Sequence, residues 1–217
     1  MIKMLKIGAG IVAVLALASC GSLAQSGIGA RLTGLVTGQD AAPQAPENAL
    51  VPAEEMIANP GKYMRVNIRN QGAWASLVQA AQNGDRSTWI GQSNVSMTFE
   101  NGLLVATRGL PRDLMGADVS QSWTAIGNGG GTAERRQDYI TDQDGISAAL
   151  LQCSIVSEGT DEITRAEIAI DTTRFKETCA GETFTFSNIY WINQQGDMVR
   201  SLQAVSPDAG YLQIDVF

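Results

Sequence analysis

Short runs of alternating apolar and polar residues, rich in β-branched side chains, extend from residue 63 to the C-terminus. Period-two alternation is typical of antiparallel strands that bury one face. Asn-Gly pairs at 83–84 and 101–102, and an Asp-Gly pair at 144–145, lie between such runs and favour type I′ hairpin turns, whose central residues need positive φ. The runs that predict strands are 63–70, 74–82, 87–91, 95–99, 103–107, 135–142, 146–157, 163–171, 189–193, 198–205 and 211–217.

This pattern predicts a mainly β domain over residues 50–217. The sequence shows no parallel βαβ pattern, and a sheet of many short antiparallel strands must protect its edges from aggregation. We therefore expect an antiparallel meander that forms a barrel-like domain or a strongly curved sandwich, with minor short helices. The segment 52–58 predicts one of these helices, because Pro52 precedes two acidic residues and the segment 59–61 ends the helix with Asn-Pro-Gly.

The N-terminus has a different pattern, in which two lysines precede the apolar segment 7–18 and small residues lie just before Cys20. This arrangement is typical of a signal peptide and resembles bacterial lipoprotein signals, whose cysteine is acylated. We predict a signal peptide over 1–19, lipid attachment at Cys20 and a flexible tether, rich in small and polar residues, over 20–49. Gly21, where known retention signals have Asp, favours the outer membrane, with the domain facing the periplasm.

Composition excludes several classes of site. The chain contains no histidine, which excludes Ser-His-Asp and Cys-His catalysis and every histidine-ligated metal site. We accordingly expect no metal and no cofactor. The net charge of −7 makes nucleic acid and anionic lipid poor partners. We therefore expect the protein to contact the membrane through its lipid anchor.

Two cysteines remain once Cys20 is assigned to the lipid. Cys153 and Cys179 form an even pair in a compartment that we expect to be oxidising, so we predict a disulfide between them. In the chain-entropy model such a bond stabilises the fold by about 3 kcal/mol. Two buried free thiols are the alternative, and the spacing lacks the Cys-x-x-Cys pattern of redox sites.

The densest group of charged side chains follows the predicted hairpin at 101–102. Arg108, Arg112 and Asp113 offer two guanidinium forks and a carboxylate, which suit a clamp for an anion, a sugar or a protein partner. In the alternative interpretation, Gly109 makes a positive-φ bend and Asp113 caps a short helix over 114–117 while pairing with one arginine.

Aromatic side chains are a second source of candidate binding residues. Trp123, in a polar and glycine-rich segment predicted as a loop over 120–132, is the tryptophan we expect to be exposed and able to stack on a sugar. The other tryptophans are expected in the core. Acidic residues are plentiful, but none forms a distinctive pair: those at 142 and 144 and at 161 and 162 are typical of solvated turns.

Several local patterns resemble the YjbF lipoprotein family, which includes the group 4 capsule lipoprotein GfcB, over roughly residues 50–217. They are 101–110 with 112–115, Gly-Asp at 84–85 leading to Thr-Trp at 88–89, Tyr-Trp-Ile at 190–192 before Gly196, and Arg-Ser-Leu-Gln at 200–203 with Pro207. The resemblance implies a periplasm-facing lipoprotein with a barrel-like β domain, associated with capsule or exopolysaccharide production and export. None of these elements is catalytic.

The resulting hypothesis is a non-enzymatic, lipid-anchored accessory protein in capsule or exopolysaccharide assembly or export. Its expected partner is the exopolysaccharide or its outer-membrane export machinery, and the sequence does not separate these two. One alternative is a polysaccharide-modifying enzyme that uses a pair of Asp or Glu residues. Another is a general envelope scaffold lipoprotein that binds protein partners.

Overall fold

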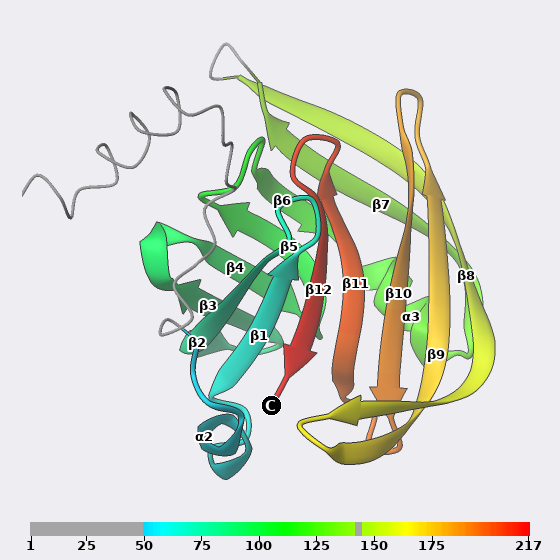
Figure 1. The fold of residues 1–217 in the computed structure, drawn as a ribbon. Coiled ribbons are helices and arrows are strands. Elements are labelled where there is room, and N and C mark those ends of the chain that lie inside the picture. Colours follow the sequence, from blue (N-terminus) through cyan, green and yellow to red (C-terminus); the bar gives the residue numbers. More distant parts are fainter. Residues whose placement is uncertain (1–49, 142–144) are drawn as a thin grey trace, which may run out of the picture. The chain divides into compact units, whose positions relative to one another are not determined.

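The computed structural model describes residues 50–141 and 145–217. The predicted signal peptide, Cys20 and tether lie outside the described residues, as does Asp144 of the predicted turn at 144–145. The described residues form twelve strands and place them in a single antiparallel sheet (Figure 1). The strands are β1 Tyr63–Ile68, β2 Ala73–Asn83, β3 Arg86–Gly91, β4 Ser96–Glu100, β5 Leu103–Arg108, β6 Leu114–Asp118, β7 Gly130–Ile140, β8 Ile146–Arg165, β9 Ile168–Ala180, β10 Thr185–Asn193, β11 Met198–Ser206 and β12 Gly210–Val216.

The sheet is a meander that curls into a nearly closed barrel. Consecutive strands are hydrogen-bonded neighbours from β1 to β5 and from β6 to β12, and β1 pairs with β12 to join the two series. The two ends of the strand order, β5 and β6, therefore approach each other across a seam. This architecture confirms the mainly β, barrel-like fold that the alternating pattern predicts.

Helices are short. α2 (Ala53–Ala58) lies where a helix was predicted, with Pro52 as its N-cap residue, and a 3-10 helix, η3 (Gln92–Asn94), precedes β4. α3 (Ser120–Gly127) corrects the predicted polar loop, because Ala125 and Ile126 are buried against the core and stabilise a helix there. Within the described ranges, no helix is both long enough and apolar enough to cross a membrane.

The glycine tract after α3 also differs from the predicted loop, since β7 already begins at Gly130. The backbone of Gly130 has φ +138°, and a Cβ atom there would lie 3.0 Å from the carbonyl oxygen of Ile155 on β8. A residue without a side chain is therefore needed where the two strands approach each other.

Two further predictions, the short helix over 114–117 and the continuous strand over 163–171, are wrong. The segment from Leu114 forms β6 and not a short helix, because it pairs with β7. The predicted strand over 163–171 is divided by a turn at Ala166 and Glu167, both with positive φ (48° and 67°), so that β8 and β9 form one long hairpin. This turn contains no Gly, Asn or Asp, the residues by which such turns are usually recognised.

Inward-facing side chains fill the barrel in two main clusters. One lies between α3 and the strands β7 to β11 and includes Leu151, Phe175 and Tyr190. The other lies mainly beneath β1 to β5 and β12 and includes Phe99 and Ile214. A smaller cluster packs α2 against the sheet, and its members are Met56, Tyr63 and Phe217.

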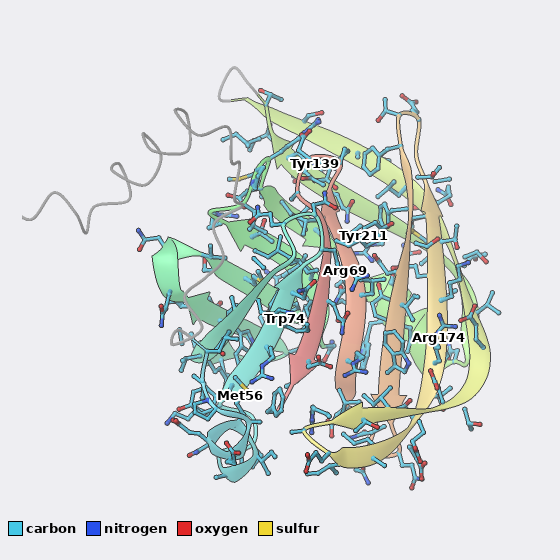
Figure 2. The ribbon with its side chains drawn as sticks, viewed as in Figure 1. Met56, Arg69, Trp74, Tyr139, Arg174 and Tyr211 are labelled. Atoms are coloured by element: carbon cyan, nitrogen blue, oxygen red, sulfur yellow. A yellow bond between two sulfur atoms is a disulfide. The ribbon has the colours of Figure 1, made fainter. Side chains whose placement is uncertain are left out.

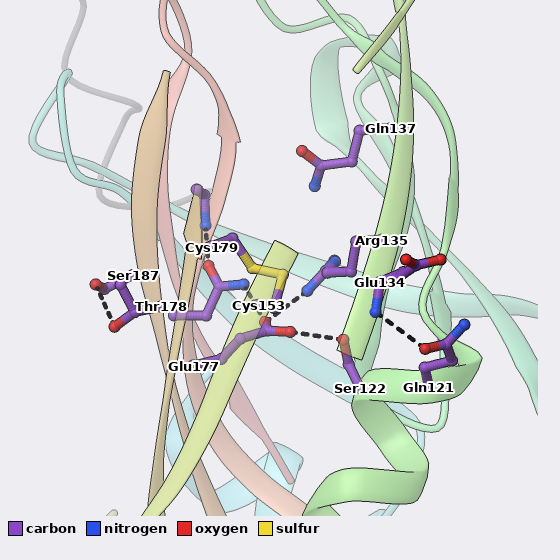
Figure 3. The surroundings of a disulfide bond; sticks show 12 residues. Gln121, Ser122, Glu134, Arg135, Gln137, Cys153, Glu177, Thr178, Cys179 and Ser187 are labelled. Carbon is purple, nitrogen blue, oxygen red and sulfur yellow. Dashed lines mark hydrogen bonds and ion pairs between the residues drawn. A yellow bond between two sulfur atoms is a disulfide. The ribbon is translucent and has the colours of Figure 1, made fainter. Parts of the chain in front are cut away.

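The predicted disulfide is present. Cys153 on β8 and Cys179 on β9 are directly opposite each other in the strand register, and both are buried in the cluster beneath α3 (Figure 3). The bond therefore links two adjacent strands inside the barrel.

Candidate functional site

Arg108 lies at the seam between β5 and β6, where side chains replace part of the backbone ladder. The Arg108 guanidinium donates hydrogen bonds to the carbonyl oxygens of Leu114 (3.1 Å) and Met115 (3.4 Å). The N–H of Leu114 donates to the Thr107 hydroxyl oxygen at 3.0 Å. These contacts join the last residues of β5 to the first residues of β6, so Arg108 is engaged in closing the barrel.

Asp113 holds the bend that connects the same two strands. Its carboxylate accepts hydrogen bonds from the Thr107 hydroxyl (2.8 Å), the Gly109 N–H (2.8 Å) and the Leu110 N–H (3.1 Å). Gly109 has φ +90°, as the alternative interpretation of this segment predicted. That interpretation is wrong about the rest, because Asp113 precedes a strand and, within the described chain, pairs with neither arginine.

Gln203 supports the other part of the β5 edge from inside the barrel. Its amide oxygen accepts the Leu104 N–H, and its amide nitrogen donates to the Gly102 carbonyl, both at 2.8 Å. A side chain of β11 thus pairs with two backbone groups at the edge of β5, of which the Leu104 N–H is buried and the Gly102 carbonyl is partly buried. Because the bonds depend on tertiary structure, the local sequence carries no signal for them.

Arg112 is separate from Arg108 and Asp113, although it is close to them in sequence. Its backbone has φ +48°, and its guanidinium lies 3.5 Å from Asp208 and 5.8 Å from the centre of the Tyr139 ring. Arg112, Tyr139 and Phe184 line a cavity of about 590 Å³ near the β9–β10 and β11–β12 turns. Burial raises the pKa of Tyr139 to about 12, although Arg135 and Arg112 oppose this rise.

Trp123 lies near the opposite end of the barrel, because successive turns of a meander alternate between its ends. In Figure 2, Tyr139 marks one end and Met56, beside the C-terminal strand, marks the other. Trp123 was predicted to be exposed, but it is half-buried on α3 and packs against the core. It lines a cavity of about 480 Å³ together with Trp89 and Phe99. The other lining residues are Gly61, Met64, Ser87, Asn101, Gly102, Arg165, Asn193, Gly196, Asp197, Met198, Val199, Ser201, Ile214, Val216 and Phe217. The four candidate binding residues are therefore divided among the seam and two cavities.

The tip of the β8–β9 hairpin folds across the end of the barrel that contains Trp123 (Figure 1). The register of β8 against β9 shifts between Ser157 and Gly159, at a β-bulge beyond which the hairpin bends. Two contacts hold the part of the hairpin beyond the bulge. The Thr164 carbonyl oxygen accepts a hydrogen bond from Arg200 on β11 at 3.2 Å, and Arg165 lies 5.0 Å from the centre of the Phe217 ring. The hairpin thereby adds Arg165 to the cavity wall, a residue that sequence analysis missed.

A buried ion pair lies beside the disulfide, and sequence analysis missed it too. Arg135 and Glu177 are 2.6 Å apart and almost completely buried. The Glu177 carboxylate also accepts a hydrogen bond from Ser122 at 2.6 Å (Figure 3). Tyr190 (2.5 Å) and Asn188 (2.8 Å) donate to the same carboxylate. The network connects α3 to β7, β9 and β10.

The charges of this network are fixed by their neighbours. Burial alone would raise the pKa of Glu177, but the Arg135 guanidinium and three hydrogen-bond donors outweigh it and hold that pKa below its ordinary value. Burial and the adjacent carboxylate raise the pKa of Tyr190 well above 10. Glu177 lies within 4.8 Å of both cysteine sulfurs, but the disulfide uses both thiols, so the three residues do not form a metal site. The network therefore stabilises the fold.

The fold defines an antiparallel, nearly closed β-barrel domain with an aromatic and polar cavity at one end. The chain belongs to the YjbF family, since residues 31–217 match the family described as group 4 capsule polysaccharide lipoprotein gfcB, YjbF. It is thus a lipoprotein of a family associated with capsule polysaccharide.

A solved structure has the same fold. The crystal structure of the hypothetical lipoprotein YmcC from Escherichia coli K12 is similar, with a TM-score of 0.65 and 17% sequence identity, over 85% of this chain and 92% of that one. No curated protein matches the chain significantly by sequence.

Proposed function

We propose that this protein is a lipid-anchored, non-catalytic accessory factor in capsule or exopolysaccharide assembly or export. The observation that carries the proposal is the match of residues 31–217 to the capsule polysaccharide lipoprotein family. In this proposal Cys20 carries the lipid in the outer membrane, the domain faces the periplasm, and the barrel contacts the polymer or its export machinery.

The composition of the two end cavities supports binding over catalysis. Glycosidases typically use two carboxyl groups that flank the scissile bond. Within the described chain, the cavity beside Trp123 has one acidic lining residue, Asp197, and the cavity beside Arg112 also has one, Glu182. Each cavity is better suited to hold a ligand than to cleave one.

A third hollow, of about 430 Å³, supports the enzymatic alternative, because Asp161, Glu162 and Asp171 line it. Asp161 is already engaged, since its carboxylate accepts the indole N–H of Trp191 at 2.8 Å. Glu162 and Asp171 are opposite each other on β8 and β9. A Glu162→Gln, Asp171→Asn variant therefore tests this alternative directly.

The test of the proposed function measures polysaccharide in a strain that lacks the gene. The strain is complemented with the wild type, with Cys20→Ala or with the Glu162→Gln, Asp171→Asn variant, at matched protein levels. We expect the deletion and Cys20→Ala strains to lose cell-surface and extracellular polymer, and the double variant to restore it. Unchanged polymer in the deletion strain would refute the proposal, and polymer of altered length in the double variant would favour an enzyme.

A further inference from the structure

The cavity beside Trp123 combines an aromatic wall with a polar rim. Trp89 and Phe99 are only 4% and 1% exposed and form the floor, while Trp123 is half-buried. The cavity volume of about 480 Å³ is in the ordinary range for a small-molecule site. Indole rings provide apolar faces on which the C–H face of a sugar ring can pack.

The rim supplies hydrogen-bonding groups from the turns at this end. Asn101 belongs to the β4–β5 turn, and Asn193 and Asp197 flank the β10–β11 turn. The Asn193 side-chain oxygen accepts two backbone N–H groups, from Gln195 (3.0 Å) and Asp197 (2.8 Å), which fixes the shape of that turn. Asp197 is exposed, so the rim reaches solvent.

Arg165 adds a positive charge that the described chain does not neutralise by an ion pair. No described carboxylate lies within 4.0 Å of its guanidinium. Asp215, the acidic residue whose charge acts on it, is already paired with Arg200 at 2.5 Å. Burial lowers the pKa of Arg165, Asp215 opposes this effect and Arg200 adds to it. A half-buried guanidinium in this position is suited to bind an anion.

We propose that this cavity binds a carboxylate-bearing sugar unit, such as a hexuronate, of the polysaccharide, with Arg165 pairing with the carboxylate and Trp123 packing against the ring. The proposal rests on the proposed function for the choice of a sugar as ligand. Asn101 and Asp197 are placed to bind sugar hydroxyl groups, while the Asn193 side chain is engaged in fixing its own turn. The net charge of −7 opposes a polyanion at long range, so we expect weak binding, with a Kd of about 1 mM for a short oligosaccharide.

The experiment titrates trigalacturonate into the whole mature chain, residues 20–217, carrying Cys20→Ser to prevent acylation. Binding is followed by NMR through the indole N–H signals, with the Trp123 signal assigned from a Trp123→Phe variant. Maltotriose serves as the neutral ligand of equal length. We expect the Trp123 signal to shift with trigalacturonate, and Arg165→Gln to weaken binding about 10-fold or more.

Two variants control for unrelated effects. Arg69→Gln removes an exposed arginine that donates to Gln213 and does not line the cavity. Trp74→Phe changes a tryptophan that was predicted in the core but is 37% exposed, and that also lies outside the cavity lining. Both are expected to bind trigalacturonate like the parent chain.

The proposal is overturned if trigalacturonate leaves the Trp123 signal unchanged at concentrations well above the expected Kd of about 1 mM. It is also overturned if maltotriose binds equally well and Arg165→Gln has no effect. These failures differ from failure of the proposed function: loss of polymer in the deletion strain without trigalacturonate binding refutes only the site. Binding at Arg165 combined with unchanged polymer refutes only the accessory role.

Discussion

Removal of the Glu177 carboxylate is expected to destabilise the barrel strongly, because Arg135 would remain buried without a counter-ion. Arg135 is 2% exposed, and its Nε atom already lacks a hydrogen-bond partner. Breaking a buried ion pair by removing one partner typically costs about 3–5 kcal/mol. Glu177→Ala also leaves the Ser122, Asn188 and Tyr190 groups without their shared acceptor, so we expect a loss in the upper part of that range.

Urea unfolding followed by tryptophan fluorescence measures this loss. With a slope of about 2 kcal/mol/M, a loss of 4 kcal/mol lowers the midpoint by about 2 M. The matched control is Glu158→Ala, which breaks a partly exposed ion pair with Arg174 and should cost about 1 kcal/mol or less. A Glu177→Ala variant whose stability falls by no more than that of the control would refute the buried-pair argument.

Dependence on pH gives an independent check. Because folding lowers the pKa of Glu177, its contribution to stability is fully present above its unfolded value of 4.5 and is lost as pH falls through the lower, folded value. The stability difference between the wild type and Glu177→Gln should therefore be constant near pH 7 and shrink below about pH 4.5. A difference that does not change in acid would show that the carboxylate charge is not responsible.

Three further predictions concern stability. Replacing Cys153 and Cys179 together with Ser should cost about 3 kcal/mol in urea unfolding, and a reducing agent should then destabilise the wild type but not the double variant. Gly102→Ala should cost about 1–3 kcal/mol, because φ is +82° and the new Cβ would lie 2.8 Å from a β11 side chain, whereas Gly84→Ala has open space and should cost less in the same measurement. Asp113→Ala should cost about 2 kcal/mol and speed amide hydrogen exchange in β5 and β6 specifically. An equal increase in exchange rate over the whole sheet would contradict its role at the seam.

The parts of the fold that local chemistry determines could be predicted from the sequence. The Asn-Gly pair at 101–102 forms the predicted hairpin turn with positive φ at both residues, and the alternating runs around both pairs form strands. At 83–84 a hairpin also forms, but Asn83 ends β2 and only Gly84 has positive φ, so the turn residues are Gly84 and Asp85. The turn at Ala166 and Glu167 could not be predicted, because its residues do not favour positive φ and the pairing of β8 with β9 imposes it. α3 was missed for a related reason, since its stability comes from burial against the barrel.

The candidate site was harder to predict, because most of it is assembled by tertiary contacts. Sequence proximity suggested one clamp, but Arg108 and Asp113 close the seam while Arg112 lies at a cavity. One signal for the buried network was present: Phe175, Glu177 and Cys179 alternate on one face of β9, so an acidic residue falls at an inward position. An inward acid predicts a buried basic partner, although it does not identify Arg135.

The seam and the cavity beside Trp123 are connected through the edge of β5. Gln203 binds the Gly102 carbonyl, and Gly102 itself forms part of the cavity wall. A Cβ atom at Gly102 would clash with Met198, which lines the same cavity, so the position of the β4–β5 turn sets the shape of the wall. Since Arg108 and Asp113 hold the same edge at its other end, replacing them would disturb the barrel before it tested ligand binding. Direct contact with a ligand is therefore better tested at Arg165 and Trp123, where no seam hydrogen bond is lost.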